Sequence, residues 1–402
     1  MQPKETFDAV VIGGGPAGAT AAADLAQQGR QVLLLDKAGR IKPCGGAIPP
    51  RLIRDFGIPE SLIVARARSA RIVAPSERQV DMPIESEGYV GMVDRCDFDP
   101  WLRHRAGAQG ADCREGTFQT LTRDGDGTAV VHYTPKGAAE PVAVRTRCVI
   151  GADGANSAVV REAFSEAERI PFVFAYHEIV RSPQPGESNG DKPAFDGERC
   201  DVYYQGRFSP DFYSWVFPHG ETASIGTGTA VKGLSLRGAI GELRRDTGLE
   251  GLETLRCEGA PIPLRPRKRW DNGRDTLLVG DAAGVVAPAS GEGIYYAMLS
   301  GRLAAEAVGA FLTSADPRAL AQARRRFMRI HGRVFWILGI MQRFWYVNDQ
   351  RRERFVSICA DRDVQRLTWE SYMNKELVRR DPLAHLRIFF KDLAHLFRLV
   401  SP

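Results

Sequence analysis

The chain has 402 residues, of which 44% are hydrophobic and 26% charged, and its formal net charge is +5. This is the composition of an ordinary globular protein with two or three lobes, and the small, diffuse basic excess argues against nucleic-acid binding. The seven cysteines are scattered and include no C-x-x-C pair, which favours reduced thiols in a cytosolic compartment and argues against a disulfide framework or a metal site. Residues 1–6 lead directly into the first predicted strand, so we expect no signal peptide, and no apolar run approaches the roughly 20 residues of a membrane-spanning helix.

The first 36 residues predict a dinucleotide-binding unit. Residues 7–12 are a short, β-branched apolar run typical of a buried parallel strand, and residues 31–35 predict a second strand. Between them, residues 13–18 carry the G-x-G-x-x-G spacing and lead into a helix of small residues over 17–28. Asp36 stands at the carboxyl end of the second strand. The complete order is more specific than the glycine spacing alone, for which a glycine-rich turn in another α/β unit is the alternative.

Each residue type in this unit suits a dinucleotide for a physical reason. Gly13 makes the tight turn, Gly15 lets the backbone approach a pyrophosphate, and Gly18 allows the helix to pack closely on the strand. The N-terminus of the helix offers N–H groups and a partial positive charge to the phosphates. Asp36 is placed to accept hydrogen bonds from a ribose, and its charge would repel a 2′-phosphate.

Two later stretches also place an acid and glycines after an apolar strand. Residues 148–157 end a strand in Gly-Ala-Asp-Gly and lead into a helix over 157–163. Residues 276–284 end another strand in Gly-Asp-Ala-Ala-Gly, and Ser290 is expected to cap a long helix that runs to about Leu312. Open α/β sheets bind ligands at the carboxyl ends of their strands, although an ordinary strand-to-helix turn explains the first stretch equally well alone.

Residues 37–60 predict a loop and a short helix rich in glycine and proline, which marks irregular backbone near a ligand or a turn. Cys44 is the reactive side chain of this run, and its alternative interpretation is a small buried residue. Farther along, Pro100 suits the first turn of a helix over 100–109, and residues 124–127 predict the turn of a hairpin.

The middle of the chain, 165–275, has more aromatic side chains and few long helices. Antiparallel strands are predicted over three runs: 202–204, 213–217 and 223–229. Tyr213, Trp215 and Phe217 alternate along one strand and therefore share one face. That face is either plain sheet core or the wall of an apolar pocket.

Residues 317–402 are predicted to be helical and amphipathic. Arginines flank the apolar run 334–341, and a mixture of basic, phenylalanine and leucine side chains continues over 386–399. This pattern fits a helical cap with a solvated basic face and, equally, an interfacial element that faces anionic lipid.

The three glycine-containing stretches together resemble the FAD-binding fold of the para-hydroxybenzoate-hydroxylase type over most of 1–165 and 270–312. Two further motifs are similar to those of the geranylgeranyl reductase family. They are Lys-Pro-Cys-Gly-Gly at 42–46 and the run 210–218, which fits P-x-x-Y-x-W-x-F-P at every fixed position. The stretch 355–372 resembles the branch of that family in (bacterio)chlorophyll biosynthesis.

The resemblance implies an α/β fold in which a Rossmann-like FAD-binding domain carries an inserted antiparallel-sheet substrate domain and a helical C-terminal region. The FAD-binding domain would comprise residues 1–165 and 270–315, the substrate domain 166–269 and the helical region 316–402.

The resemblance also implies the roles of individual residues. Cys44, beside the flavin, and Tyr213 with Trp215, along an isoprenoid channel, would form the catalytic site. Residues of the glycine turns, the acids that follow the strands and a few neighbours would bind FAD: Gly13, Gly15, Pro16, Ala17, Gly18, Asp36, Lys37, Cys44, Gly45, Gly46, Arg95, Asp153, Gly154, Gly280, Asp281, Gly291, Gly293 and Ile294.

The implied activity is the FAD-dependent reduction of a geranylgeranyl group, stepwise to phytyl, with NADPH as electron donor. The substrate would be geranylgeranylated (bacterio)chlorophyll, geranylgeranyl diphosphate, or both. One alternative is a flavin monooxygenase, against which Cys44 and the 213–217 strand argue. The other is a non-catalytic flavoprotein that carries or senses isoprenoid pigment. No nucleic-acid partner is expected, and the location is expected to be cytoplasmic, with a peripheral position at the inner, photosynthetic membrane left open.

Overall fold

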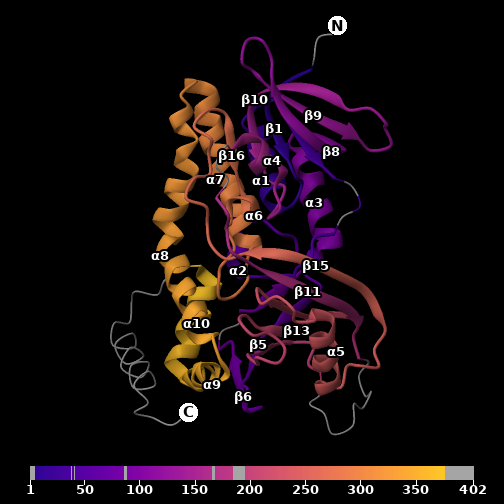
Figure 1. Ribbon diagram of the computed structural model, residues 1–402, viewed down its shortest axis with the longest axis vertical. Coiled ribbons are helices and arrows are strands. Elements are labelled where there is room, and N and C mark those ends of the chain that lie inside the picture. Colours follow the sequence, from indigo (N-terminus) through magenta and orange to yellow (C-terminus); the bar gives the residue numbers. More distant parts are fainter. Residues whose placement is uncertain are drawn as a thin grey trace. The chain divides into compact units, whose positions relative to one another are not determined.

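The computed structural model describes residues 5–37, 39, 41–85, 88–164, 168–183 and 195–375 (Figure 1). The chain divides into two compact units. The first unit consists of three segments, namely Met1–Ile41, Cys96–Phe172 and Pro261–Trp336. The second unit consists of Lys42–Arg95, Val173–Ala260 and the chain from Ile337 onward.

The first unit is built on a six-stranded sheet. Its strands, in spatial order, are β1 (Thr6–Ile12), β2 (Val32–Asp36), β8 (Asp112–Arg123), β9 (Ala129–Pro135), β10 (Val142–Gly151) and β16 (Thr276–Leu278). The long strand β10 pairs antiparallel with β9 through its first half and parallel with β1 and β16 farther along. Because β1, β2, β10 and β16 are mutually parallel, their carboxyl ends meet at one edge, where ligands of open α/β sheets bind.

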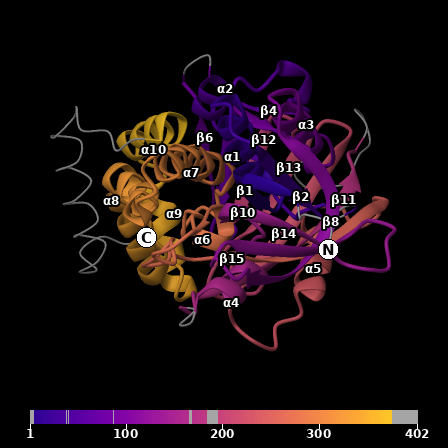
Figure 2. The ribbon, with the colours of Figure 1, turned by 90° about the horizontal axis from the view of Figure 1, so that it is seen from above.

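Two helices of small residues pack together in this unit. α1 (Pro16–Gln27) and α7 (Ile294–Ser314) lie side by side in both ribbon views (Figures 1 and 2). A Cβ added to Gly301 would lie 2.2 Å from the Ala17 carbonyl oxygen, so the two backbones are in close contact. The other helices that belong wholly or largely to this unit are α3 (Arg95–Ala108), α4 (Ala158–Ala163), α6 (Gly280–Ala283) and η2 (Pro317–Ala319), together with the first part of α8 (Ala321–Trp345).

The predicted start of the helix over 100–109 was wrong. α3 begins at Arg95, so Pro100 lies inside the helix rather than in its first turn. Proline lacks the N–H that would bond to the carbonyl of residue 96, and this close to the N-terminus only that single bond is forfeited. The acidic residue of the first turn is Asp97, where it interacts favourably with the helix dipole.

The second unit is built on a seven-stranded sheet. Its strands, in spatial order, are β15 (Thr254–Pro263), β11 (Phe172–Arg181), β14 (Thr222–Thr229), β13 (Ser214–His219), β12 (Arg199–Tyr203), β5 (Ser69–Val73) and β6 (Gln79–Pro83). A small three-stranded sheet contains β3 (Ala47–Ile48), β7 (Val90–Met92) and β4 (Ala65–Ala67). The remaining helices of this unit are α2 (Pro50–Phe56), η1 (Glu60–Leu62), α5 (Leu236–Asp246), α9 (Asp349–Ile358) and α10 (Arg362–Asn374).

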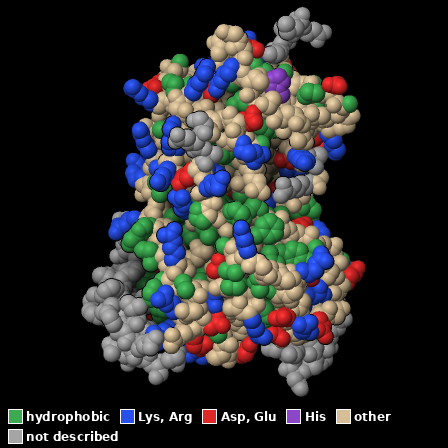
Figure 3. Space-filling model, in the orientation of Figure 1, with side chains coloured by type: hydrophobic (Ala, Val, Ile, Leu, Met, Phe, Trp, Pro, Cys, Tyr) green, Lys and Arg blue, Asp and Glu red, His purple; other side chains and the backbone are tan. Residues whose placement is uncertain are grey.

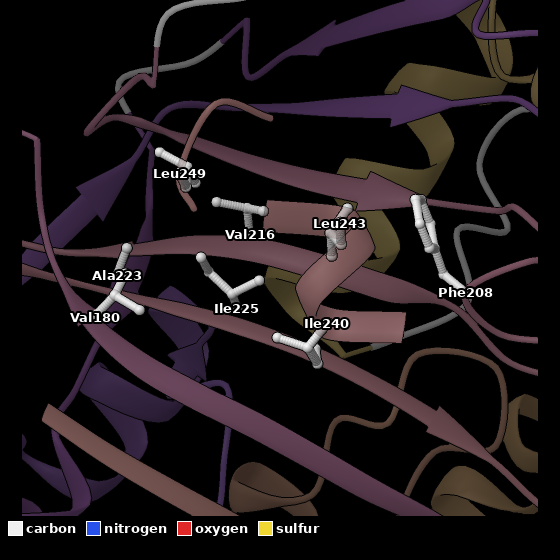
Figure 4. Close-up of a cluster of buried hydrophobic side chains, with 8 residues drawn as sticks. All are labelled: Val180, Phe208, Val216, Ala223, Ile225, Ile240, Leu243 and Leu249. Atoms are coloured by element: carbon white, nitrogen blue, oxygen red, sulfur yellow. The ribbon is translucent and has the colours of Figure 1, made fainter. Parts of the chain in front are cut away.

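Helix α5 covers one face of the larger sheet. Figure 4 shows Ile240 and Leu243 of α5 meeting Val216 of β13 and Ile225 of β14, and all four belong to one buried cluster. Because neighbouring side chains of a strand point to opposite faces, Val216 toward α5 puts Trp215 and Phe217 on the other face. The strand therefore separates the α5 core from the aromatic face that the sequence predicts.

The predicted domain bounds differ from the division into units. They placed residues 42–95 in the FAD-binding domain, whereas this segment belongs to the second unit, because β5 pairs in parallel with β12. The C-terminal amphipathic run 386–399 lies outside the described residues. Among the helices that the structure describes, none combines the length and the apolarity needed to cross a bilayer.

Candidate functional site

The turn between β1 and α1 leaves room only for glycine. Gly13 has a φ of +109°, and a Cβ there would lie 2.4 Å from the Ala152 carbonyl oxygen. A Cβ on Gly18 would lie 1.9 Å from the Gly13 carbonyl oxygen. These two glycines therefore allow the tight turn and the close approach of α1 that the spacing predicts.

Helix α1 presents its N-terminus at this turn. The helix starts at Pro16, and Gly15 precedes it without any hydrogen bond from a side chain to the first turn. No residue of this described first turn is acidic. The N–H groups and the positive end of the helix dipole are therefore available to a phosphate.

Asp36 lies against this glycine turn, as its place after β2 predicts. Its Oδ2 accepts a hydrogen bond from the Gly14 N–H at 2.5 Å, and its Oδ1 is 3.8 Å from Nη1 of Arg103. Burial raises the pKa of Asp36, while Gly14 and Arg103 act in the opposite direction. The carboxylate is thus fixed at the mouth of the turn, where a ribose hydroxyl could donate to it.

Asp153 has a structural task that sequence reasoning missed. Its carboxylate accepts hydrogen bonds from the Ser157 hydroxyl at 2.5 Å and from the backbone N–H groups of Ala158 and Val159 at 2.6 and 3.1 Å. Asp153 therefore caps the N-terminus of α4. Burial raises its pKa and these bonds lower it. Gly154, which follows with a φ of +85°, turns the backbone into that cap.

The third predicted stretch forms the start of two helices. Gly280 opens α6 with a φ of +59° and donates its N–H to the Ser300 hydroxyl of α7 at 2.9 Å, and Asp281 is buried beside it. The prediction that Ser290 caps the long helix was wrong. α7 begins at Ile294 after Gly293, and Glu292 accepts the Tyr295 N–H at 3.1 Å, because the glycine-containing loop extends three residues farther than expected.

In the second unit, the structure brings two sequence motifs together that are far apart in the chain. The Gly46 N–H donates to the Cys44 Sγ at 3.4 Å, and Gly46 has a φ of +72°. A Cβ on Gly45 would lie 3.1 Å from the Phe217 ring and 3.9 Å from Nε1 of Trp215. The Cys44–Gly46 loop therefore lies directly on the aromatic face of β13.

The aromatic side chains of this face form a continuous row. The ring centroids of Tyr213 and Trp215 are 6.0 Å apart, and those of Trp215 and Phe217 are 6.2 Å apart. Tyr213 precedes the strand, which starts at Ser214, and stacks on Phe212 at 4.3 Å. Burial raises the pKa of Tyr213 above its usual range, so its hydroxyl stays protonated.

For two of the residues predicted to bind the cofactor, the structure gives a position but does not indicate a role in binding. Lys37 is exposed just after β2 in the first unit, and Arg95 is buried at the start of α3 in the second unit. Their contribution to cofactor binding stays a prediction. Within the part of the chain that the structure describes, no group of three His, Cys, Asp or Glu side chains could hold a metal ion.

The chain is closely similar to characterised sequences. Residues 6–173 match the family described as FAD binding domain. The chain is 58% identical over 396 residues to the geranylgeranyl diphosphate reductase of Rhodobacter capsulatus, which covers 98% of this chain and 99% of that protein. The chain belongs to the geranylgeranyl reductase family.

A second family member and a solved structure extend this similarity. The chloroplastic geranylgeranyl diphosphate reductase of Oryza sativa subsp. japonica is 36% identical over 408 residues, covering 97% of this chain and 86% of that protein. A geranylgeranyl bacteriochlorophyll reductase-like protein from Thermoplasma acidophilum has the same fold, with a TM-score of 0.80, 23% identity and coverage of 96% and 99% of the two chains. The predicted family, the α/β fold with an FAD-binding domain and the enzyme class are therefore confirmed.

The residues of this geranylgeranyl reductase fit FAD. Gly13, Gly14 and Gly18 have no space for a Cβ, Gly15 gives the first turn of α1 no side-chain cap, and Asp36 is fixed beside this turn. These are the features that a pyrophosphate and an adenosine ribose require. α7 offers a second helix N-terminus after Gly293, where the Glu292 carboxylate accepts the Tyr295 N–H.

Sequence reasoning missed two residues of the FAD turn. A Cβ on Gly14 would lie 2.7 Å from Cδ of Arg103 and 2.9 Å from Cβ of Asp36, so this position also requires glycine. The run of three consecutive glycines was a signal that could have identified it. Arg103 had no such signal, since it reaches the turn from α3, and only the fold brings the two together.

Proposed function

We propose that this member of the geranylgeranyl reductase family saturates C=C bonds of a geranylgeranyl group, stepwise to phytyl, with NADPH as electron donor. The group would be carried by (bacterio)chlorophyll, by a diphosphate, or by both in turn. The two relatives are geranylgeranyl diphosphate reductases, which supports this substrate class. The observation that carries the proposal is the contact of the Cys44–Gly46 loop with Trp215 and Phe217, which joins a candidate reactive group to an apolar surface.

The first unit would hold the cofactor. The Gly13–Gly18 turn and the N-terminus of α1 bind the pyrophosphate, Asp36 binds the ribose, and the loop before Ile294 binds the flavin edge. Bound FAD would supply the hydride, which an isolated alkene accepts only if a proton reaches its other carbon. The chain must therefore also exclude water and provide that proton.

The second unit would bind the tail by apolar area. At about 0.8 kcal/mol for each buried methylene-sized group, a twenty-carbon chain offers on the order of 10 kcal/mol before entropy is subtracted. The row from Tyr213 to Phe217 supplies flat apolar surface for this purpose. A surface that binds by area lets the tail slide, so that one site can serve several double bonds.

Cys44 is the candidate proton donor. Its thiol is half-buried, accepts a bond from the Gly46 N–H and belongs to the loop on the aromatic face. A neutral thiol is a weak acid, and a bound water is the competing source of the proton. If Cys44 is only a small packing residue, its removal will leave the reaction unchanged.

Product analysis tests the proposed reaction. The purified enzyme is given NADPH with geranylgeranyl diphosphate or with the geranylgeranylated pigment, and products are separated over time. We expect partly reduced intermediates and then phytyl, with the double bond nearest the ester retained. Trp215→Ala should accumulate the intermediates, because lost contact area speeds release between steps.

Three outcomes would contradict this activity. Hydroxylated product with oxygen uptake would indicate a flavin monooxygenase. NADPH oxidation with an untouched tail would show that electrons do not reach the alkene. Binding of pigment without NADPH consumption would indicate a carrier or a sensor.

We also propose that α8 binds the surface of an anionic membrane. Residues 321–345 contain no acidic residue, and the exposed positions include Arg325, Arg329 and Arg333. On the same helix, Ile330 follows Arg329 and is 51% exposed, and Trp336 lies three residues after Arg333 and is 69% exposed. Figure 3 shows Lys and Arg side chains along the edge of the molecule at which Figure 1 places α8. Arginine with exposed apolar side chains is the combination that a headgroup region attracts.

A further inference from the structure

A row of four polar or aromatic side chains crosses the larger sheet of the second unit on its aromatic face. The row runs from Trp215 on β13 to Ser224 on β14, His177 on β11 and Glu258 on β15, which are successive neighbours in the sheet. Ser224 is fully buried, and His177 is 3% exposed. Buried polar groups in such a position must satisfy one another.

A glycine makes the row possible. Gly226 is paired across the sheet with Trp215 on one side and with His177 on the other. A Cβ on Gly226 would lie 2.0 Å from Cζ2 and 2.2 Å from Cε2 of Trp215. The indole therefore lies over the bare backbone of β14, and its N–H reaches Ser224 at 3.1 Å. The ring of His177 stands at its far side, 6.4 Å away between centroids.

With a neutral imidazole at His177, the donors and acceptors of the row allow only one direction for the hydrogen bonds. The indole N–H of Trp215 can only donate, so Ser224 accepts from it. Glu258 is a carboxylate, so Nε2 of His177 donates to it at 3.0 Å. In neutral His177 this leaves Nδ1 as an acceptor, 2.9 Å from the Ser224 oxygen, and the Ser224 hydroxyl donates to it. Each group is thereby oriented by its neighbour.

The row is anchored at its charged end. Arg256 lies two residues before Glu258 on β15, and its Nε is 2.9 Å from the other carboxylate oxygen of Glu258. A second nitrogen of Arg256 is 3.4 Å from Asp94. Glu258 therefore has a cation on one oxygen and His177 on the other, so the imidazole has little freedom to rotate.

We infer that His177 is a positioning residue, which acts through Ser224 to fix the plane of the Trp215 indole on the substrate face. Among the bonds described, the indole of Trp215 makes its side-chain hydrogen bond to Ser224. The ring packs on Gly226, which has no side chain that could fix the orientation of the indole. Without the hydrogen bond to Nδ1 of His177, the Ser224 hydroxyl can rotate, and its oxygen then accepts the indole N–H less well. The consequence for substrate rests on the proposed function, in which Trp215 lines the isoprenoid tail.

Exchange of the indole N–H with solvent tests this assignment on the full-length FAD-loaded protein. The Trp215 signal is identified in ¹⁵N spectra by its loss in Trp215→Phe. We expect this N–H to exchange about tenfold faster in His177→Leu than in the wild type. His177→Asn keeps an oxygen near the place of Nδ1 and should restore exchange to within about twofold. Equal exchange in wild type and His177→Leu would overturn the assignment.

A matched control removes a similar pair elsewhere. Nε2 of His132 lies 2.7 Å from the Thr122 hydroxyl on the β8–β9 hairpin, so His132→Leu deletes a histidine–hydroxyl bond far from Trp215 in sequence. It should leave the Trp215 signal unchanged. If His177→Leu disturbs the other indole signals as well, His177→Phe replaces it and carries the same expectation, since it keeps a flat ring at this position and removes the acceptor Nδ1.

The effect on products is measured separately. His177→Leu should release more partly reduced tail than the wild type, with unchanged FAD binding. If the wild type reduces no isoprenoid, the proposed function fails while the exchange result still decides the role of His177. If exchange speeds up and the product pattern stays the same, the indole is positioned by His177 but its plane does not control the reaction, and that consequence is withdrawn.

Discussion

Replacing Cys44 tests whether this residue donates a proton in the reaction or only packs in the fold. We expect Cys44→Ala to retain FAD and to lose alkene reduction by about 10²-fold or more, because a positioned proton donor contributes about that much. Cys257→Ala serves as the control, since Cys257 is an exposed thiol of the same unit. Rates and product distributions are compared by chromatography. A Cys44→Ala enzyme with wild-type products and rate would make Cys44 a packing residue.

His219 should make the second unit sensitive to acid. Burial against the Gly46 loop lowers the pKa of His219 to about 4, below the value of about 6.5 for an unfolded chain. Between these values the unfolded chain binds a proton that the folded chain does not. The stabilisation is complete above about pH 6.5 and falls by up to about 3 kcal/mol as the pH drops toward 4.

Urea unfolding at about pH 7.5 and about pH 5 measures this effect. His219→Gln should reduce the loss of unfolding free energy between the two pH values, whereas His132→Gln on the β8–β9 hairpin should not. Carboxylates contribute to the pH dependence in every variant, so the comparison isolates the histidine. An identical loss in His219→Gln and wild type would show that His219 is not the acid-sensitive group.

At the scale of elements, the basic face of α8 gives a measurable prediction. We expect the protein to sediment with anionic vesicles at low salt, and salt to release it, because surface charges are screened. Arg329→Gln with Arg333→Gln should weaken binding about 30-fold, at about 1 kcal/mol for each arginine near the surface. The control is Arg54→Gln with Arg181→Gln, which removes the same charge from α2 and β11. Equal sedimentation with neutral and anionic vesicles would reject the proposal.

The elements show what the sequence could predict. The strand, turn and helix over residues 7–36 were predictable because their apolar runs and glycines are local signals. The capping by Ser290 failed because a loop with three glycines nearby can extend before a helix starts. The partners of Asp36 and Trp215 were beyond prediction, since Arg103 and Ser224 reach them only through tertiary packing. Local residue type predicts elements, and the fold decides which side chains meet.

For the whole molecule, FAD should act as a stabilising ligand. We expect a yellow protein whose non-covalent flavin is released by heat and is FAD rather than FMN. Asp36→Ala should weaken FAD about tenfold or more, because it removes the ribose acceptor and the partner of the Gly14 N–H. The thermal midpoint in excess FAD should fall accordingly.

Asp8→Ala is the matched control for that loss. Asp8 accepts the Gln31 N–H at 3.0 Å beside the opposite end of β1, so its removal costs a carboxylate–backbone bond without touching the glycine turn. Both variants should lose some stability as apoproteins. Unchanged FAD affinity in Asp36→Ala, or FMN in the wild type, would contradict the role given to Asp36.

The place of β16 in the sheet has a consequence for how the protein is made. β16 pairs with β10, yet more than a hundred residues separate them in the chain, and α7 follows β16. A ribosome must therefore finish the entire antiparallel sheet before the last strand and helix of the cofactor unit exist. Until then the flank of β10 has no neighbour on that side, which is a site for wrong pairing in a crowded cell. Nascent chains stalled before residue 276 should not retain FAD, and full-length chains should.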